Sequence, residues 1–176
     1  NNLQAAENKG LKEKCASPLK LEKDVLQTVT MEELYDTVYP PKVPVVDGLL
    51  YNGTYLFVGA PKVGKSFFMA QLGYHVSKGI PLWEYPVNAG TVLYLALEDD
   101  YGRLQKRLSR MFGVESTDAL HLATKSKRLN QGLEEQLKRF VAEHKDARLI
   151  IIDTLQKIRE LGGDKYSYAS DYDIVA

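Results

Sequence analysis

The stretch Gly59–Ser66, which reads GAPKVGKS, decides the fold that we expect for this chain. It matches the pattern G-x-x-x-x-G-K-[ST] at each defined position. The apolar run TYLFVGA at 54–60 leads into it, and SFFMAQLGYHVSKG, with apolar residues at helical spacing, follows it up to Gly79. A strand, a glycine loop and a helix in this order form the context in which the pattern binds phosphates. We therefore expect a phosphate-binding loop here rather than a chance match in a turn.

The residue types of this loop fit the chemistry of a nucleotide. Gly59 and Gly64 let the backbone turn tightly, so that its N–H groups can approach the phosphates. The helix that starts near Lys65 adds the positive end of its dipole. Lys65 is expected to reach the β- and γ-phosphates, and the Ser66 hydroxyl to bind Mg²⁺. For Lys62, a solvated loop position is the alternative. The predicted nucleotide-binding residues are Gly59, Ala60, Pro61, Lys62, Val63, Gly64, Lys65, Ser66 and Phe67.

Apolar runs and amphipathic segments alternate through the rest of the chain. Near-continuous apolar runs predict buried strands, and apolar residues spaced by three or four predict helices. The predicted strands are 54–60, 91–98, 120–124 and 148–155, and the predicted helices are 66–79, 99–113 and 133–144. Buried strands that alternate with helices indicate an α/β fold, in which helices cover both faces of a mainly parallel sheet.

The N-terminal part has a different composition. Residues 1–28 are rich in Lys, Glu, Asn and Ala, which predicts a flexible tail. Residues 29–52 hold a lead-in helix and a proline-rich segment, where Thr30 and Glu33 have the spacing of a capping box. The predicted core, which begins with the glycine loop and its flanking segments, then occupies residues 53–176.

Two carboxylates end apolar strands and are candidates for chemistry. The carboxyl ends of parallel strands border the crevice where α/β proteins bind ligands. Asp153, after LIII, is a candidate metal ligand acting through water, with a helix or turn cap as the alternative. Glu98, after LAL, is a candidate general base for an attacking water. Asp99 and Asp100 follow it, and we expect both to cap the next helix.

Composition excludes several classes of protein. The 176 residues carry 23 basic and 23 acidic side chains, so the chain is not a polycation that coats nucleic acid. Its one cysteine, Cys15, excludes a disulfide scaffold and a zinc finger, and favours a reducing cytoplasmic location. The sequence has no apolar run near the roughly 20 residues that span a bilayer, and NNLQAAENKG has no signal-peptide character, so we expect no membrane association.

The three motifs GAPKVGKS, YLALEDD and LIIIDTLQKIR together resemble those of RecA-like P-loop ATPases. The likeness is greatest to RepA-type plasmid and phage helicases and to AAA-family ATPases of mobile elements. EDDYGRLQKRL, with Leu104 and Arg107, also resembles the segment after the catalytic glutamate of DnaB-type replicative helicases. The resemblance covers about residues 45–176. It implies that Glu98 activates water, that Asp153 holds Mg²⁺ through water, and that ATP drives a homo-oligomeric ring, such as a hexamer, along single-stranded DNA.

The sequence departs from this pattern in two respects. It ends at SDYDIVA, before the family's sensor residue and arginine finger, so we expect a partial core with weak or no turnover. The family's DNA-contacting loops are not evident either. The segment 159–171, RELGGDKYSYASD, fits either a DNA-binding loop or a plain surface loop, and the same alternatives hold for Lys125, Lys127 and Arg128.

The sequence also fits other functions and other roles for some residues. A regulatory or loader ATPase that acts on a protein partner would use the same nucleotide site without responding to DNA. A small-molecule kinase is disfavoured because no basic lid is visible. We expect Trp83 to pack on the sheet edge rather than to stack on a base. Arg103, Arg107 and Arg110 share part of a helix surface and can face nucleotide, another subunit or water.

Overall fold

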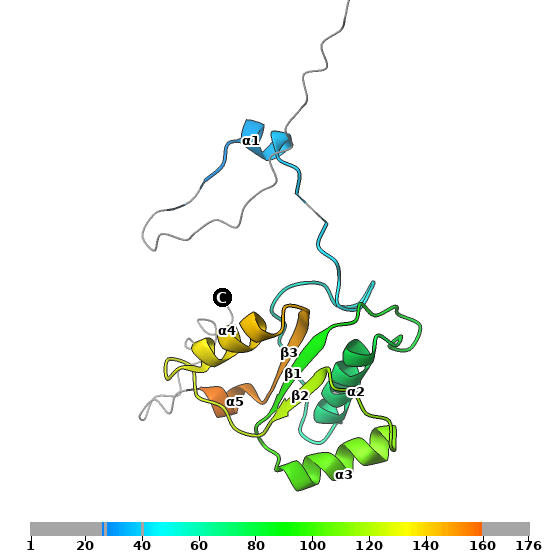
Figure 1. Cartoon of the computed structure of the whole chain (residues 1–176). Helices are drawn as coiled ribbons and strands as arrows, with labels where there is room; N and C mark the ends of the chain where they lie inside the picture. Colours follow the sequence, from blue (N-terminus) through cyan, green and yellow to red (C-terminus); the bar gives the residue numbers. More distant parts are fainter. Residues whose placement is uncertain (1–25, 27, 40, 160–176) are drawn as a thin grey trace, which may run out of the picture. The chain divides into compact units, whose positions relative to one another are not determined.

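The computed structural model describes residues 26, 28–39 and 41–159 (Figure 1). The chain divides into two units, residues 1–42 and 43–176. The first contains α1 (Met31–Asp36), and the predicted capping box is present, because Glu33 N donates to Thr30 Oγ1 at 3.2 Å and Thr30 N donates to Glu33 Oε2 at 2.8 Å. The predicted tail, apart from residues 26 and 28, and the segment 159–171, apart from Arg159, lie outside the described residues.

The second unit is built on a parallel sheet. Its strands are β1 (Thr91–Ala96), β2 (Leu120–Ala123) and β3 (Ala147–Asp153). The order is β2-β1-β3, and β1 pairs in parallel with both neighbours, with Leu93 opposite His121 and Ile150. The predicted α/β fold with a parallel sheet is confirmed.

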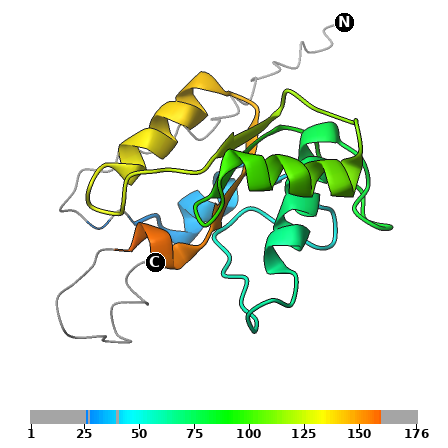
Figure 2. The same cartoon turned by 90° about the horizontal axis from the view of Figure 1, so that it is seen from below.

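Helices cover both faces of this sheet (Figures 1 and 2). Val92, Tyr94 and Ala96 of β1 pack into one core with α2 (Lys65–Lys78) and α3 (Tyr101–Phe112). Leu93 and Leu95 point to the other face and pack with α4 (Leu133–Glu143) and α5 (Leu155–Ile158). Because alternate side chains of β1 are buried on opposite faces, the strand is almost wholly apolar. Each buried Val or Leu side chain contributes about 1.5–3 kcal/mol by burial.

The helix boundaries follow local signals. Gly79 ends α2 in the left-handed conformation, with φ of 66°, and its N–H points to the carbonyls of His75 and Val76. Asp100 begins α3, because its Oδ1 accepts a hydrogen bond of 2.8 Å from Arg103 N. These are the glycine stop and the acidic cap that the sequence predicts.

The predicted strand at 54–60 is wrong. No strand is assigned to these residues, and Tyr55, Leu56, Phe57 and Val58 are between 53 and 74% exposed. β3 pairs with β1 along one edge, and no other described segment pairs with its second edge. An apolar run forms a strand only where a neighbour takes up its backbone hydrogen bonds, and the described part of the chain supplies none to this segment.

Smaller corrections concern strand ends and Trp83. The strand predicted at 91–98 ends at Ala96, and the one predicted at 148–155 ends at Asp153, before α5 begins at Leu155. Trp83 is 59% exposed and stacks on Phe68 of α2 with ring centroids 5.7 Å apart, so it lies on a helix rather than on the sheet edge. Among the described helices, none is long and apolar enough to span a bilayer.

Candidate functional site

The glycine loop leads directly into α2. Gly64 is the N-cap of this helix and has φ of 94°, a left-handed conformation that suits glycine. No side chain caps the helix, so its first N–H groups are open to a ligand. The Lys65 ammonium donates to the carbonyls of Gly59 and Ala60, both at 2.8 Å, and is therefore held within its own loop. Pro61, Lys62 and Val63 are exposed.

Ser66 and Asp153 approach the same side chain. Asp153 ends β3 in phase with Leu149 and Ile151, on the face that α2 covers. The buried hydroxyl of Tyr94 donates to Asp153 Oδ2 at 2.9 Å and lies 3.4 Å from the carbonyl oxygen of Ser66. The first turn of the loop helix and the carboxyl end of β3 are thus joined through one tyrosine.

Glu98 lies two residues beyond β1, in an exposed turn. Leu97 N donates to Asp153 O at 2.7 Å, which holds this turn beside the end of β3. The Thr154 hydroxyl donates to Glu98 Oε1 at 3.2 Å. Glu98 and Asp153 therefore lie at the same edge of the sheet, as the strand-end argument predicts. No hydrogen bond or ion pair joins Glu98 to residues 59–66 in the described structure.

The two aspartates after Glu98 differ. Asp100 caps α3, as predicted, but Asp99 does not. The Asp99 side chain is only 7% exposed and forms ion pairs with Arg107 at 2.7 Å and with Arg103 at 3.6 Å. Since the N-cap of α3 is Asp100, Asp99 lies just before the helix, where arginines from its first two turns reach it. The Arg107 guanidinium also lies over the ring of Phe67, 5.2 Å from its centroid, so it bridges α3 and α2.

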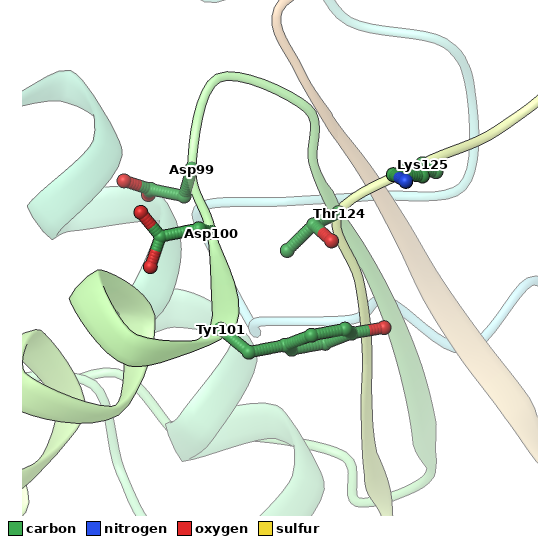
Figure 3. Close-up of a pocket in the computed structure, with 5 residues that line it drawn as sticks. All are labelled: Asp99, Asp100, Tyr101, Thr124 and Lys125. Atoms are coloured by element: carbon green, nitrogen blue, oxygen red, sulfur yellow. The ribbon is translucent and has the colours of Figure 1, made fainter.

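A hollow of about 410 Å³ opens beside this turn (Figure 3). Asp99, Asp100 and Tyr101 line it from the start of α3, and Thr124 and Lys125 line it from the segment after β2. Tyr101 is 62% exposed, and its ring extends toward the β2 side in Figure 3. An exposed aromatic ring and a lysine therefore border the carboxyl edge of the sheet next to Glu98.

A family model described as an AAA domain matches residues 15–174. The chain belongs to this AAA domain family. Membership supports nucleotide binding and ATPase activity in general terms. The comparisons find no match among curated proteins or among solved structures.

The oxygen atoms at the site of this AAA domain fit magnesium. A hydroxyl at Ser66 and a carboxylate at Asp153 are hard oxygen donors, which Mg²⁺ prefers. The described residues contain no group of three or more His, Cys, Asp or Glu side chains able to hold a metal. Magnesium is usually held by one or two protein oxygens together with phosphates and water, so this small donor set suits a nucleotide-bound ion.

Three contacts of the candidate site are not predicted from the sequence. They are made by Tyr94, by Thr154 and by Arg107. Tyr94 is the residue with a hydroxyl in the otherwise apolar stretch VLYLAL, and this signal could have identified it. Thr154 directly follows the predicted metal ligand, and its hydrogen bond to Glu98 depends on the pairing of β1 with β3. The sequence places Arg107 on a helix surface, but its ion pair with Asp99 depends on where α3 begins.

Proposed function

We propose that this AAA domain binds ATP with Mg²⁺, hydrolyses it to ADP and couples the hydrolysis to single-stranded DNA as a replicative-type helicase. One observation carries the proposal: the parallel neighbours β1 and β3 bring Glu98 and Asp153 to the edge where the glycine loop enters α2, with Tyr94 touching both Ser66 and Asp153. A phosphate site and two carboxylates at one sheet edge are what nucleotide hydrolysis needs.

Binding uses the loop and the helix start. The N–H groups of residues 59–66 and the uncapped start of α2 receive the phosphate oxygens. Lys65 exchanges its two loop carbonyls for the β- and γ-phosphates, because a dianionic acceptor attracts an ammonium more strongly than a neutral carbonyl does. Ser66, and Asp153 through water, are the residues that would hold magnesium, and the ion would neutralise charge on the phosphates.

Hydrolysis uses Glu98 as the base. The hydrogen bond from Thr154 occupies Oε1 and orients the carboxylate, which leaves Oε2 to accept a proton from water. The water oxygen forms a bond to the γ-phosphorus while the bond from that phosphorus to the bridging oxygen of ADP breaks. The site releases ADP and inorganic phosphate, and the proton then leaves Glu98 for solvent.

The coupling to DNA and the assembly into a ring rest on the resemblance of the three motifs to those of RecA-like helicases. The exposed ring of Tyr101 and the ammonium of Lys125 add a surface feature beside the catalytic edge. Aromatic rings stack on bases and lysines contact phosphates in proteins that bind single strands. A ring of such subunits gives a single strand repeated contacts of this kind.

The test is the rate of ATP hydrolysis with and without single-stranded DNA. We expect hydrolysis by the wild-type chain to be weak without DNA, DNA to raise it severalfold, and Lys65→Ala to remove hydrolysis under both conditions. The Lys65→Arg variant controls for loss of the positive charge. A hydrolysis rate that is the same with and without DNA contradicts the helicase proposal. A regulatory or loader ATPase that acts on a protein partner is then the function to test.

A further inference from the structure

Tyr94 places a hydroxyl inside an apolar core. It lies in the middle of β1, has no exposed surface, and packs among residues such as Val92, Ala96 and Ile151 on the face covered by α2. A hydroxyl in such surroundings is stable only with hydrogen-bond partners. The partners of this hydroxyl therefore indicate what it does.

Both partners belong to motifs that we assign to nucleotide binding. The shorter contact, 2.9 Å, runs to Asp153 Oδ2, and the longer one, 3.4 Å, to the carbonyl oxygen of Ser66. A tyrosine hydroxyl has one proton, so the carboxylate receives the stronger hydrogen bond and the carbonyl the weaker. The tyrosine thereby fixes one carboxylate oxygen at a set distance from the first turn of α2.

The buried surroundings of this hydroxyl favour its protonated form, which donates to Asp153. Burial raises the pKa of the Tyr94 hydroxyl well above its usual range, and the negative charge of Asp153 raises it further. The hydrogen bond of 2.9 Å to Asp153 Oδ2 is the contact that places this carboxylate.

We propose that Tyr94 is a positioning residue for magnesium: its hydroxyl holds the Asp153 carboxylate against the first turn of α2, so that Asp153 and the Ser66 side chain face one nucleotide-bound ion. Oδ2 is occupied by Tyr94, and Oδ1 is left for the ion or its water. This inference rests on the proposed nucleotide site. It adds a residue of β1 to that site, which the motifs do not contain.

The experiment uses the full chain and a fluorescent ATP analogue, whose affinity is measured over a series of Mg²⁺ concentrations and in EDTA. In Tyr94→Phe we expect the Mg²⁺ needed for half-maximal binding to rise about tenfold, which is typical for loss of a residue that orients a metal ligand. Affinity in EDTA should not change. Tyr74→Phe is the matched control, since Tyr74 is also buried but packs on Phe112, and it should match the wild type.

A second measurement separates positioning from general packing. If Tyr94 acts through Asp153, the double variant Tyr94→Phe with Asp153→Asn should bind Mg²⁺ and nucleotide no more weakly than Asp153→Asn alone. Additive losses overturn the proposal, as does a Tyr94→Phe chain with the wild-type Mg²⁺ dependence or one that does not fold.

If Lys65→Ala and Asp153→Asn also leave binding unchanged, the nucleotide site itself is wrong. If Asp153→Asn removes the Mg²⁺ dependence and Tyr94→Phe does not, only the role of Tyr94 is wrong.

Discussion

At the scale of single residues, the ion pair between Asp99 and Arg107 connects the turn that carries Glu98 to the loop helix. Asp99 directly follows Glu98, and Arg107 lies over Phe67, which directly follows Ser66. The Arg107 side chain is 16% exposed and that of Asp99 7%, so both charges are largely removed from water. Such a pair is costly to break, because the remaining charge stays buried without its partner.

We predict that Asp99→Ala lowers the free energy of unfolding by about 3 kcal/mol, because it leaves the Arg107 guanidinium buried and without its nearest carboxylate. Adding Arg107→Met should recover most of this loss, since no buried charge then remains. Urea denaturation measures both variants. Lys138→Ala is the control: it breaks an ion pair with Glu134 whose side chains are 73% and 70% exposed, and it should cost under about 1 kcal/mol. Equal losses in Asp99→Ala and Lys138→Ala would contradict the prediction.

At the scale of elements, the start of β1 is attached to the residue before β3 by side-chain hydrogen bonds. The Thr91 hydroxyl lies 3.0 and 2.9 Å from the two carboxylate oxygens of Asp146, and Thr91 N lies 3.2 Å from Oδ2. Gly90 fits closely beside this contact, because a Cβ at that position would lie 2.5 Å from Asp146 O. The start of β1 is thus attached beside β3 at the end of the sheet opposite Glu98 and Asp153, next to a register shift between Thr91 and Val92.

This attachment predicts a pH dependence of stability. The hydrogen bond from the Thr91 side chain lowers the pKa of Asp146 below its ordinary 3.8. The stability that the carboxylate adds is therefore complete above about pH 3.8 and is lost as the pH falls through the lowered pKa. We expect Asp146→Asn to melt below the wild type at pH 6, and the difference to shrink at pH 3. The matched variant Asp118→Asn, at an exposed aspartate, should show no such change. A difference in melting temperature that is constant with pH would contradict this account.

The elements that the sequence predicts well are those whose signals are local. The cap at Asp100, the glycine stop at Gly79 and the spacing of Leu133, Leu137 and Phe140 fix helices without knowledge of the rest of the fold. The segment 54–60 has an equally strong apolar pattern, yet it forms no strand. Its signal is conditional, because strand formation needs a partner that the local sequence cannot specify.

The features of the candidate site also fall into those that simple rules predict and those that depend on the exact fold. That Glu98 and Asp153 share one edge follows from the rule for parallel strands, and the structure agrees. The prediction that both Asp99 and Asp100 cap α3 holds for Asp100 alone, because only the exact start of the helix decides which aspartate caps it. The contact of Tyr94 with Asp153 depends on the register of β1 and β3, and a single sequence does not contain that register.

At the scale of the whole molecule, the order β2-β1-β3 makes the site possible. With β1 in the centre, its carboxyl end lies beside that of β3, and α2 covers one face of the sheet (Figure 1). Tyr94 and Asp153 lie on this face. The glycine loop reaches this edge because α2 begins there. The proposed base, the proposed metal ligand and the phosphate loop therefore come from three separate segments of the AAA domain and meet at one edge of the sheet.

The most direct test of this account compares ATP hydrolysis and ATP binding by the wild-type chain and by Glu98→Gln, with Mg²⁺ present. The glutamine keeps the size of the side chain and its hydrogen bond with Thr154 but cannot accept a proton from water. We predict that Glu98→Gln binds ATP as tightly as the wild type and hydrolyses it at least about 100-fold more slowly. Equal hydrolysis by the two chains would contradict the assignment of Glu98 as the base and, with it, the catalytic arrangement at this edge of the sheet.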